Sequence, residues 1–331
     1  MHTFFRSARL TTTHLEFTVR AATALELDVY SGAALRGSFF NAIWTRFCVN
    51  KEAQTCAQCP LHTSCPVSAL VAPLREESSW GQDIPRPYTI LPPLDGARVY
   101  EPGERFSFGM TLMGDIVQLL PYILLSISPL EAEGLGHRLP QNGGQRGHFS
   151  VEQVEVYHPW SGQRAILYQS GDTFPNRPVA SVTIQDCLQR AEQLDAERIT
   201  LEFITPMRII DREHLVKQPL LRPLLQRLLE RYLALERHYG NPTLTLSKEE
   251  RDILLQQAEA TTCSANATHW QELTSYSNRQ KRATPISGLQ GRATFTGPLA
   301  PLLPFLTIGE LIHVGKNAVK GNGHYRILTE H

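Results

Sequence analysis

Residues 313–328, HVGKNAVKGNGHYRIL, combine three glycines with lysines and histidines and contain no acidic residue. Glycine lets the backbone turn so that amide groups point at an anion, and lysine adds positive charge. The segment lacks the Gly-Lys-Ser/Thr sequence that opens a helix in nucleotide P-loops. A strand is expected at 325–328, at the end of the segment, where a P-loop would have a helix. We expect this closing loop to contact a polyanion, with a plain glycine-rich turn as the alternative. Its candidate binding residues are Gly315, Lys320, Gly321, Gly323 and His324.

A second stretch, residues 275–292 (SYSNRQKRATPISGLQGR), is also basic and free of acids. From Arg279 to the C-terminus the chain has seven Lys or Arg and only two acids, Glu310 and Glu330. Phosphate backbones favour such strips, whereas a solvated hairpin face is the alternative. Together with the closing loop, the strip favours RNA or single-stranded nucleic acid as the ligand. Its candidate contacts are Arg279, Lys281, Arg282 and Arg292.

Histidines near the closing loop could transfer protons at neutral pH. His313 stands three residues before Lys316, which suits RNA cleavage by the 2′-hydroxyl, with Lys316 stabilising the charge of the phosphorane. Tyr30 and Arg36, at the mouth of an expected first helix, are possible partners of this site. For each of these side chains a packing or surface role is the alternative. The candidate catalytic residues are His313, Tyr30 and Lys316.

Four of the six cysteines cluster as C-x7-C-x2-C-x5-C, at Cys48, Cys56, Cys59 and Cys65. In a reducing compartment such a cluster favours a metal over disulfides, and four thiolates complete a tetrahedral site with no open position. We therefore expect a structural zinc ion that does no chemistry. An iron–sulfur cluster, or thiols that are unliganded or oxidised, are the alternatives.

The bulk composition is that of a globular chain of 331 residues with formal net charge +0. A nucleic-acid surface must therefore be a local patch. No apolar run reaches membrane-spanning length, and the first residues lack a signal-peptide core. These observations predict a cytoplasmic protein that has no membrane partner.

A degenerate internal repeat predicts the domain organisation. Residues 117–157 and 298–328 both run from Leu-Leu-Pro-aromatic through an apolar helix and a glycine-rich basic loop into a strand. Two copies of one domain explain the repeat, with chance similarity as the alternative. Each copy fits βαββαβ, so we expect an α+β protein with a domain at 1–157 that carries the cysteine insertion at 48–65, a hairpin and linker at 158–197, and a domain at 198–331.

The expected elements follow from apolar spacing. In the first copy we expect strands at 15–21, 105–114 and 148–157, a helix at 32–49 and a Pro-rich loop at 83–96. In the second we expect a bent strand or strand pair at 198–210, a helix at 219–240 that ends at Gly240, and a hairpin formed by SYSNRQKRATPI and LQGRATFTG.

Nine segments in order support a family resemblance: ALRGSFFNAIW (34–44), CAQCPLHTSC (56–65), DIPRPYTILPPL (83–94), YEPGERFSFGMTLMG (100–114), LLPYIL (119–124), GLGHR (134–138), ITPMRI (204–209), YSNRQKRATPISGLQG (276–291) and GELIHVGKNAVKGNGHYRI (309–327). The chain resembles CRISPR-associated precursor-RNA processing endoribonucleases of the repeat-associated mystery protein (RAMP) superfamily. The resemblance extends to the branch with a C-terminal His-x-Gly-Lys loop and a four-cysteine insertion.

The resemblance implies two tandem ferredoxin-like domains, similar to RNA-recognition motifs. It implies metal-independent cleavage of precursor crRNA within the CRISPR repeat, which leaves a 2′,3′-cyclic phosphate. It further implies that both glycine-rich loops touch RNA, and that other CRISPR effector subunits are possible partners. The additional candidate RNA contacts are Arg36, Arg46, His137, Arg138 and Arg146.

One departure concerns the first helix. Relatives of this branch often have an LRGxFxH arrangement, whereas Asn41 stands at the histidine position in LRGSFFN. Asparagine cannot take a proton, so either the base lies elsewhere, with His313 as first choice, or the protein binds RNA without cutting it. The second interpretation is a non-catalytic RAMP-type subunit of an effector complex. A zinc-containing protein scaffold is a third, which the acid-free strips disfavour.

Overall fold

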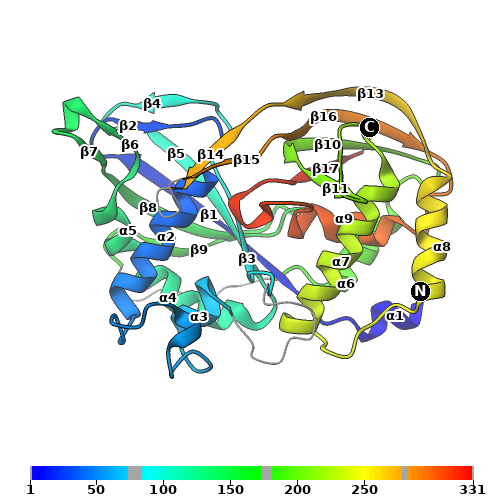
Figure 1. The fold of residues 1–331 in the computed structure, drawn as a ribbon, viewed down its shortest axis with the longest axis horizontal. Helices are drawn as coiled ribbons and strands as arrows, with labels where there is room; N and C mark the ends of the chain where they lie inside the picture. Colours follow the sequence, from blue (N-terminus) through cyan, green and yellow to red (C-terminus); the bar gives the residue numbers. More distant parts are fainter. Residues whose placement is uncertain (1, 74–83, 173–180, 278–281, 330–331) are drawn as a thin grey trace. The chain divides into compact units, whose positions relative to one another are not determined.

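The computed structural model describes residues 2–73, 84–172, 181–277 and 282–329 (Figure 1). The chain divides into two compact units. We call Thr13–Ser181 the N-terminal unit, and Met1–Thr12 together with Val182–His331 the C-terminal unit.

The N-terminal unit is built on a five-stranded sheet with strand order β3-β5-β1-β8-β9. Its first four strands have the order of a ferredoxin-like βαββαβ fold, in which the first strand lies between the third and the fourth. The elements are β1 (Thr12–Ala21), β2 (Leu25–Leu27), α2 (Gly32–Phe47), η1 (Cys56–Gln58), α3 (Pro66–Val71), β3 (Tyr88–Leu91), β4 (Arg98–Tyr100), β5 (Arg105–Met113), η2 (Gly114–Leu119), α4 (Leu120–Leu125), α5 (Ile127–Glu133), β6 (Leu135–Leu139), η3 (Pro140–Asn142), β7 (Gln145–Gly147), β8 (Phe149–Tyr157) and β9 (Arg164–Gln169).

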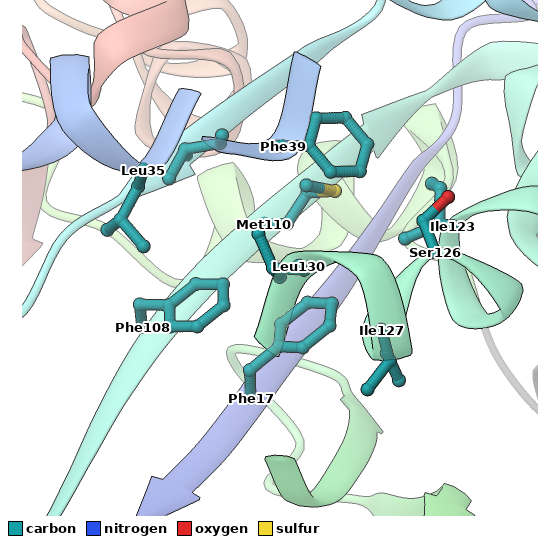
Figure 2. Close-up of a pocket in the computed structure, with 10 residues that line it drawn as sticks. Phe17, Leu35, Phe39, Phe108, Met110, Ile123, Ser126, Ile127 and Leu130 are labelled. Carbon is teal, nitrogen blue, oxygen red and sulfur yellow. The ribbon is translucent and has the colours of Figure 1, made fainter. Parts of the chain in front are cut away.

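Alternating apolar residues on β1 explain the core of this unit. β1 pairs antiparallel with β8, and the side chains of Leu15 and Phe17 are buried. Figure 2 shows Phe17 and Phe108 from the sheet beside Phe39 of α2 and Leu130 of α5. The two phenylalanines from the sheet stack, with ring centroids 4.7 Å apart. Only about 10 Å³ of space remains between these side chains, room for about one water, so this region is a packed core.

The C-terminal unit repeats the same strand order in a four-stranded sheet, β13-β16-β10-β17. Its elements are α1 (His2–Ser7), α6 (Ile184–Glu192), β10 (Arg198–Met207), β11 (Ile209–Asp211), β12 (His214–Val216), α7 (Leu221–Tyr239), α8 (Lys248–Glu259), β13 (Thr262–Gln271), β14 (Thr274–Ser277), β15 (Arg282–Pro285), β16 (Gly288–Thr296), α9 (Leu303–Ile312), η4 (Ala318–Lys320) and β17 (Tyr325–Leu328). Both units thus fit the α+β, ferredoxin-like fold expected from the sequence.

Most expected elements are present, and one pairing was wrong. The helix predicted at 219–240 is α7, and the bent strand at 198–210 is β10 followed by β11. The expected hairpin of SYSNRQKRATPI with LQGRATFTG does not form, because β14 pairs with β15 and β16 lies between β13 and β10. Of residues 158–197, β9 joins the sheet of the N-terminal unit, whereas α6 lies in the C-terminal unit.

A buried carboxylate ties residues near the start of the chain to the C-terminal unit. Glu236 on α7 is fully buried and accepts hydrogen bonds from the backbone amides of Arg9 (3.0 Å), Leu10 (3.0 Å) and Asn241 (2.8 Å). The Tyr232 hydroxyl donates a fourth at 3.0 Å. A buried polar group needs hydrogen-bond partners, and the segment before β1 supplies two of them, so this segment is a structural part of the C-terminal unit.

No single helix in the part of the chain that the structure describes is long and apolar enough to span a membrane. The segments Gly114–Leu125 and Ile127–Glu133 meet the length and composition criteria only when taken together, and they are bent by 56° at their junction.

Candidate nucleic-acid interface

The closing loop of the C-terminal unit folds tightly against its own protein backbone. The amides of Val314, Lys316 and Gly323 donate to the carbonyl oxygens of Gly323 (2.9 Å), Arg208 (2.9 Å) and Pro206 (3.1 Å). A Cβ atom at Gly323 would overlap the Val314 carbonyl oxygen, and one at Gly315 would lie 2.5 Å from that of Arg208. These glycines therefore permit internal packing, and these three amides do not point at an anion as the sequence led us to expect.

The positive charge of this loop resides on its lysine side chains. Lys316 is exposed, whereas Lys320 is half-buried and Gly321 closes the short helix η4 with a left-handed backbone. A cationic side chain can approach a phosphate without help from the backbone. Lys316 and Lys320 are thus the groups of this loop that could meet an anion.

The two histidines that flank the closing loop stack on each other inside it. The ring centroids of His313 and His324 lie 4.8 Å apart, and only 3% of the His313 surface is exposed. Enclosure, with the Arg326 charge nearby, lowers the pKa of His324 to about 4, so this ring is neutral at pH 7. The His313 ring is therefore almost fully enclosed by the protein.

The basic strip is only partly described by the structure. Arg279 and Lys281 lie outside the described residues, and Arg282 opens β15, where its backbone pairs with Ser277. Arg292 on β16 is exposed and forms an ion pair with Glu202 at 2.7 Å. The charge of Arg292 is thus partly compensated within the protein, a feature that a count of acids along the strip could not reveal.

In the N-terminal unit, the glycine-rich segment forms the hairpin β6–β7 packed over β2. A Cβ at Gly147 would lie 2.6 Å from Leu25 Cα, and one at Gly136 would overlap the Glu26 carbonyl oxygen. This close approach brings His137 Nε2 to 3.0 Å from Asp28 Oδ1. The hydrogen bond to Asp28, with Glu26 adding negative charge, raises the pKa of His137.

Arginines near this hairpin are held by carbonyl and carboxylate oxygens. Arg138 donates to the Gly144 carbonyl oxygen at 3.2 Å, and Arg146 pairs with Glu133 at 3.1 Å. Glu133 also accepts a hydrogen bond of 3.0 Å from the amide of Asn41 on α2. Asn41 therefore acts as a donor in a network with Glu133 and Arg146.

The remaining candidates of the N-terminal unit lie on or before α2. Arg36 is half-buried. Burial raises the pKa of the nearby Tyr88 hydroxyl, and the Arg36 guanidinium offsets only part of this rise. Arg46 is exposed in the last turn of α2, and Tyr30 is half-buried in the turn before it. Sequence reasoning missed Asp28 and Glu133, because we searched for strips that lack acids.

The four clustered cysteines lie in one part of the N-terminal unit. Cys48 caps the C-terminal end of α2, and Cys65 precedes α3. Burial raises the pKa of Cys56, and the negative charges of Cys65, Cys48 and Cys59 raise it further, so the four thiols are within electrostatic reach of one another. The donor chemistry suits a soft cation. Among the described residues, however, no group of three or more His, Cys, Asp or Glu side chains is arranged to hold a metal ion.

Comparisons with known families cover both units. Residues 10–180, just over half of the chain, match the family model AF_1859_N, described as an N-terminal domain. Residues 201–325 match the model of the CRISPR-associated endoribonuclease Cas6. An uncharacterized protein of Archaeoglobus fulgidus is 25% identical over 308 residues, which cover 92% of this chain and 93% of that protein.

Solved structures share the fold over nearly the whole chain. Thermus thermophilus Cas6 (TTHB231) is 12% identical with a TM-score of 0.54, and the match covers 96% of this chain and 99% of that chain. A Cas6 (TTHA0078) product complex is 17% identical with a TM-score of 0.50, covering 96% and 100%. A partial Cas6-RT-Cas1–Cas2 complex is 13% identical with a TM-score of 0.58, covering 97% of this chain and 46% of that one.

Proposed function

We infer the function of this chain from its family, because it belongs to the CRISPR-associated RNA-processing proteins of the RAMP type. We propose that it binds CRISPR repeat RNA and cleaves precursor crRNA by attack of a 2′-hydroxyl, without a catalytic metal, leaving a 2′,3′-cyclic phosphate. The observation that carries the proposal is the match of residues 201–325 to the Cas6 endoribonuclease, because this segment contains most of the sheet, the basic strip and most of the closing loop.

RNA binding rests on exposed cations presented by folded elements. Lys316, Arg46 and Arg138 are exposed, and each lies on or next to a helix, loop or hairpin with a fixed backbone. RNA helices are recognised largely through shape and backbone contacts, which such cations supply. The two glycine-rich segments fix the backbone that carries Lys316 and Arg138, whereas Arg46 is carried by α2.

For catalysis, the assignment of His313 as general base with Lys316 and Tyr30 stays a prediction. Its physical requirement is an open closing loop, since the His313 ring is enclosed and stacked on His324. A general base contributes roughly 10²–10⁴-fold, and His313→Ala should lose that factor in cleavage rate. Lys316→Ala should lose both rate and RNA affinity.

A second candidate function is a non-catalytic subunit that holds crRNA within a CRISPR effector complex. The amide of Asn41 favours it, because asparagine donates to Glu133 at the helix position where a histidine was expected. Such a subunit needs the basic surface but no proton transfer.

A structural zinc ion held by Cys48, Cys56, Cys59 and Cys65 is part of the proposal. Two observations support this part of the proposal: four thiols are the ligands that zinc prefers, and the charges of Cys48, Cys59 and Cys65 act on Cys56. Binding would require these side chains to draw together. The ion would stabilise the segment between α2 and α3 and take no part in cleavage.

One experiment separates the two functions. Purified protein is incubated with end-labelled CRISPR-repeat RNA in EDTA, and products are analysed for a cyclic phosphate, while binding is measured in parallel. One product with a cyclic phosphate supports the nuclease. Tight binding without cleavage selects the subunit, and absence of both contradicts the proposal as a whole.

A further inference from the structure

We propose that His137 is a catalytic residue, which donates a proton to the 5′-oxygen that leaves the scissile phosphate, and that Asp28 is its positioning residue. The inference deepens the proposed function and rests on it. It does not depend on which group takes the proton from the 2′-hydroxyl.

The first support is the geometry of the pair. Asp28 directly follows β2, and His137 lies on β6, which packs on β2. Nε2 of His137 lies 3.0 Å from Oδ1 of Asp28, so the carboxylate fixes one ring nitrogen. The pair joins residues 109 positions apart, and the close approach at Gly136 leaves no room for a side chain between the two strands.

The second support is accessibility. The side chain of His137 is 53% exposed and that of Asp28 is 75% exposed, so a polymer can reach the ring without any movement of the protein. His313, the other candidate, is only 3% exposed. Of the two histidines, His137 is therefore the more accessible.

Electrostatics favours the acid role. The charged groups that act on the ring are Asp28 and Glu26, both from β2 and the turn that follows it. Arg138, the next residue on β6, is directed to the Gly144 carbonyl of its own hairpin. Two carboxylates raise the pKa of His137, which increases the imidazolium fraction at neutral pH. An imidazolium near neutrality is a suitable general acid.

The chemistry balances without an added reactant. The 2′-oxygen forms a bond to phosphorus while the bond from phosphorus to the 5′-oxygen breaks. The proton of the 2′-hydroxyl passes to a base or to water, and the proton on the imidazolium passes to the 5′-oxygen. The products are a cyclic phosphate and a 5′-hydroxyl, and His137, now neutral, regains its proton from solvent.

A surface ion pair with no function is the competing explanation. An exposed pair of this kind contributes little to stability. Loss of the pair through a substitution should therefore leave the protein folded, so cleavage can be measured on intact variants.

The test compares His137→Ala with His148→Ala, a histidine of the same unit that is also exposed and whose Nδ1 lies 3.3 Å from the Glu131 carbonyl oxygen. Single-turnover cleavage is measured on repeat RNA and on the same RNA with sulfur in place of the 5′-oxygen. Because a thiolate leaves without protonation, loss of a general acid should slow the oxygen substrate by roughly 10²–10⁴-fold and leave the sulfur substrate near the wild-type rate. His148→Ala should cut both substrates like wild type.

A pH profile provides the second readout. Because the protonated ring is the active form, the wild-type rate should fall as pH rises through the raised pKa of His137. Asp28→Asn keeps the shape of the partner but removes its charge, so this limb should move to lower pH. A variant that merely disturbed packing would not move it.

The outcomes separate the two levels of the proposal. If wild type cuts and His137→Ala cuts both substrates at the wild-type rate, the role of His137 is refuted while the nuclease function stands. Equal slowing on the oxygen and sulfur substrates likewise overturns the acid role. If wild type binds repeat RNA but never cuts it, the proposed nuclease function fails, and the role of His137 fails with it.

Discussion

Replacing Gly136 with alanine tests whether the hairpin β6–β7 depends on close backbone approach. Two costs arise at this position. Its φ of +80° belongs to the left-handed region, which costs a side-chain-bearing residue about 1–2 kcal/mol. The new Cβ would also overlap the Glu26 carbonyl oxygen, and forcing extra atoms into a packed site costs typically about 1–3 kcal/mol.

Gly143 is a matched control in the same hairpin. Its φ is +64°, and an added Cβ would meet nothing within 4 Å. Gly143→Ala therefore carries the backbone cost alone, and the two variants should differ by about 1–3 kcal/mol in unfolding free energy. For a unit of this size the difference corresponds to about 2–12 °C in Tm.

Differential scanning calorimetry of the full chain measures this difference, because both glycines belong to the unit Thr13–Ser181. Gly136→Ala should also slow RNA cleavage, since displacing β6 from β2 separates His137 from Asp28. Equal Tm values for the two alanine variants would refute the packing argument.

Three further predictions concern other parts of the chain. The pKa of His324 is about 4 in the folded state against about 6.5 in the unfolded state, so its ring is neutral in the folded protein at pH 7. Its contribution to the free energy of unfolding, on the order of 3 kcal/mol, is therefore present above pH 6.5 and lost as pH falls toward 4. Urea unfolding from pH 7.5 to 4 should show this loss in wild type but not in His324→Gln, and parallel curves would contradict it. Replacing Arg279, Lys281 and Arg282 with alanine should lower the slope of log K against log salt by about 2–3, at roughly 0.7–0.9 per lost phosphate contact. As a control, alanine at Lys248 and Arg251 on α8 should leave the slope unchanged. If the slope were also unchanged in the triple variant, the RNA would have to bind elsewhere. Elemental analysis of protein made under reducing conditions should find about one zinc per chain, lost in Cys56→Ser but kept in Cys263→Ser; metal-free wild type would exclude the site.

The sequence predicted the elements whose side chains alternate or recur with helical spacing. β1, β5 and α7 are of this kind, because each buries one apolar face. β13, TCSANATHWQ, was missed because its side chains are mostly exposed, and backbone pairing with β16 places it in the sheet. The two ferredoxin-like copies could be recognised, because the internal repeat covers the second helix and the fourth strand of each copy.

The site was harder to predict, because local composition does not show in which direction a side chain points or which distant residues it contacts. His313 follows a helix end with φ +59°, and its ring turns into the protein, although the sequence around it looks like a surface loop. Asp28 reaches His137 only because two strands pack together. A carboxylate beside a basic segment was discounted by a search for acid-free strips, yet it is this pairing that orients the histidine.

The contacts of Glu236 have a consequence for the order in which the protein folds during synthesis. The amides of Arg9 and Leu10 are made before their acceptor, which follows more than 200 residues later. The ring of Phe305, which contacts Phe5 of the same segment, is made later still. At 5–20 residues per second the delay before Glu236 appears is on the order of 10–50 s. Until then the amides of Arg9 and Leu10 lack their acceptor, so this segment takes its final place in the C-terminal unit only after α7 has been made.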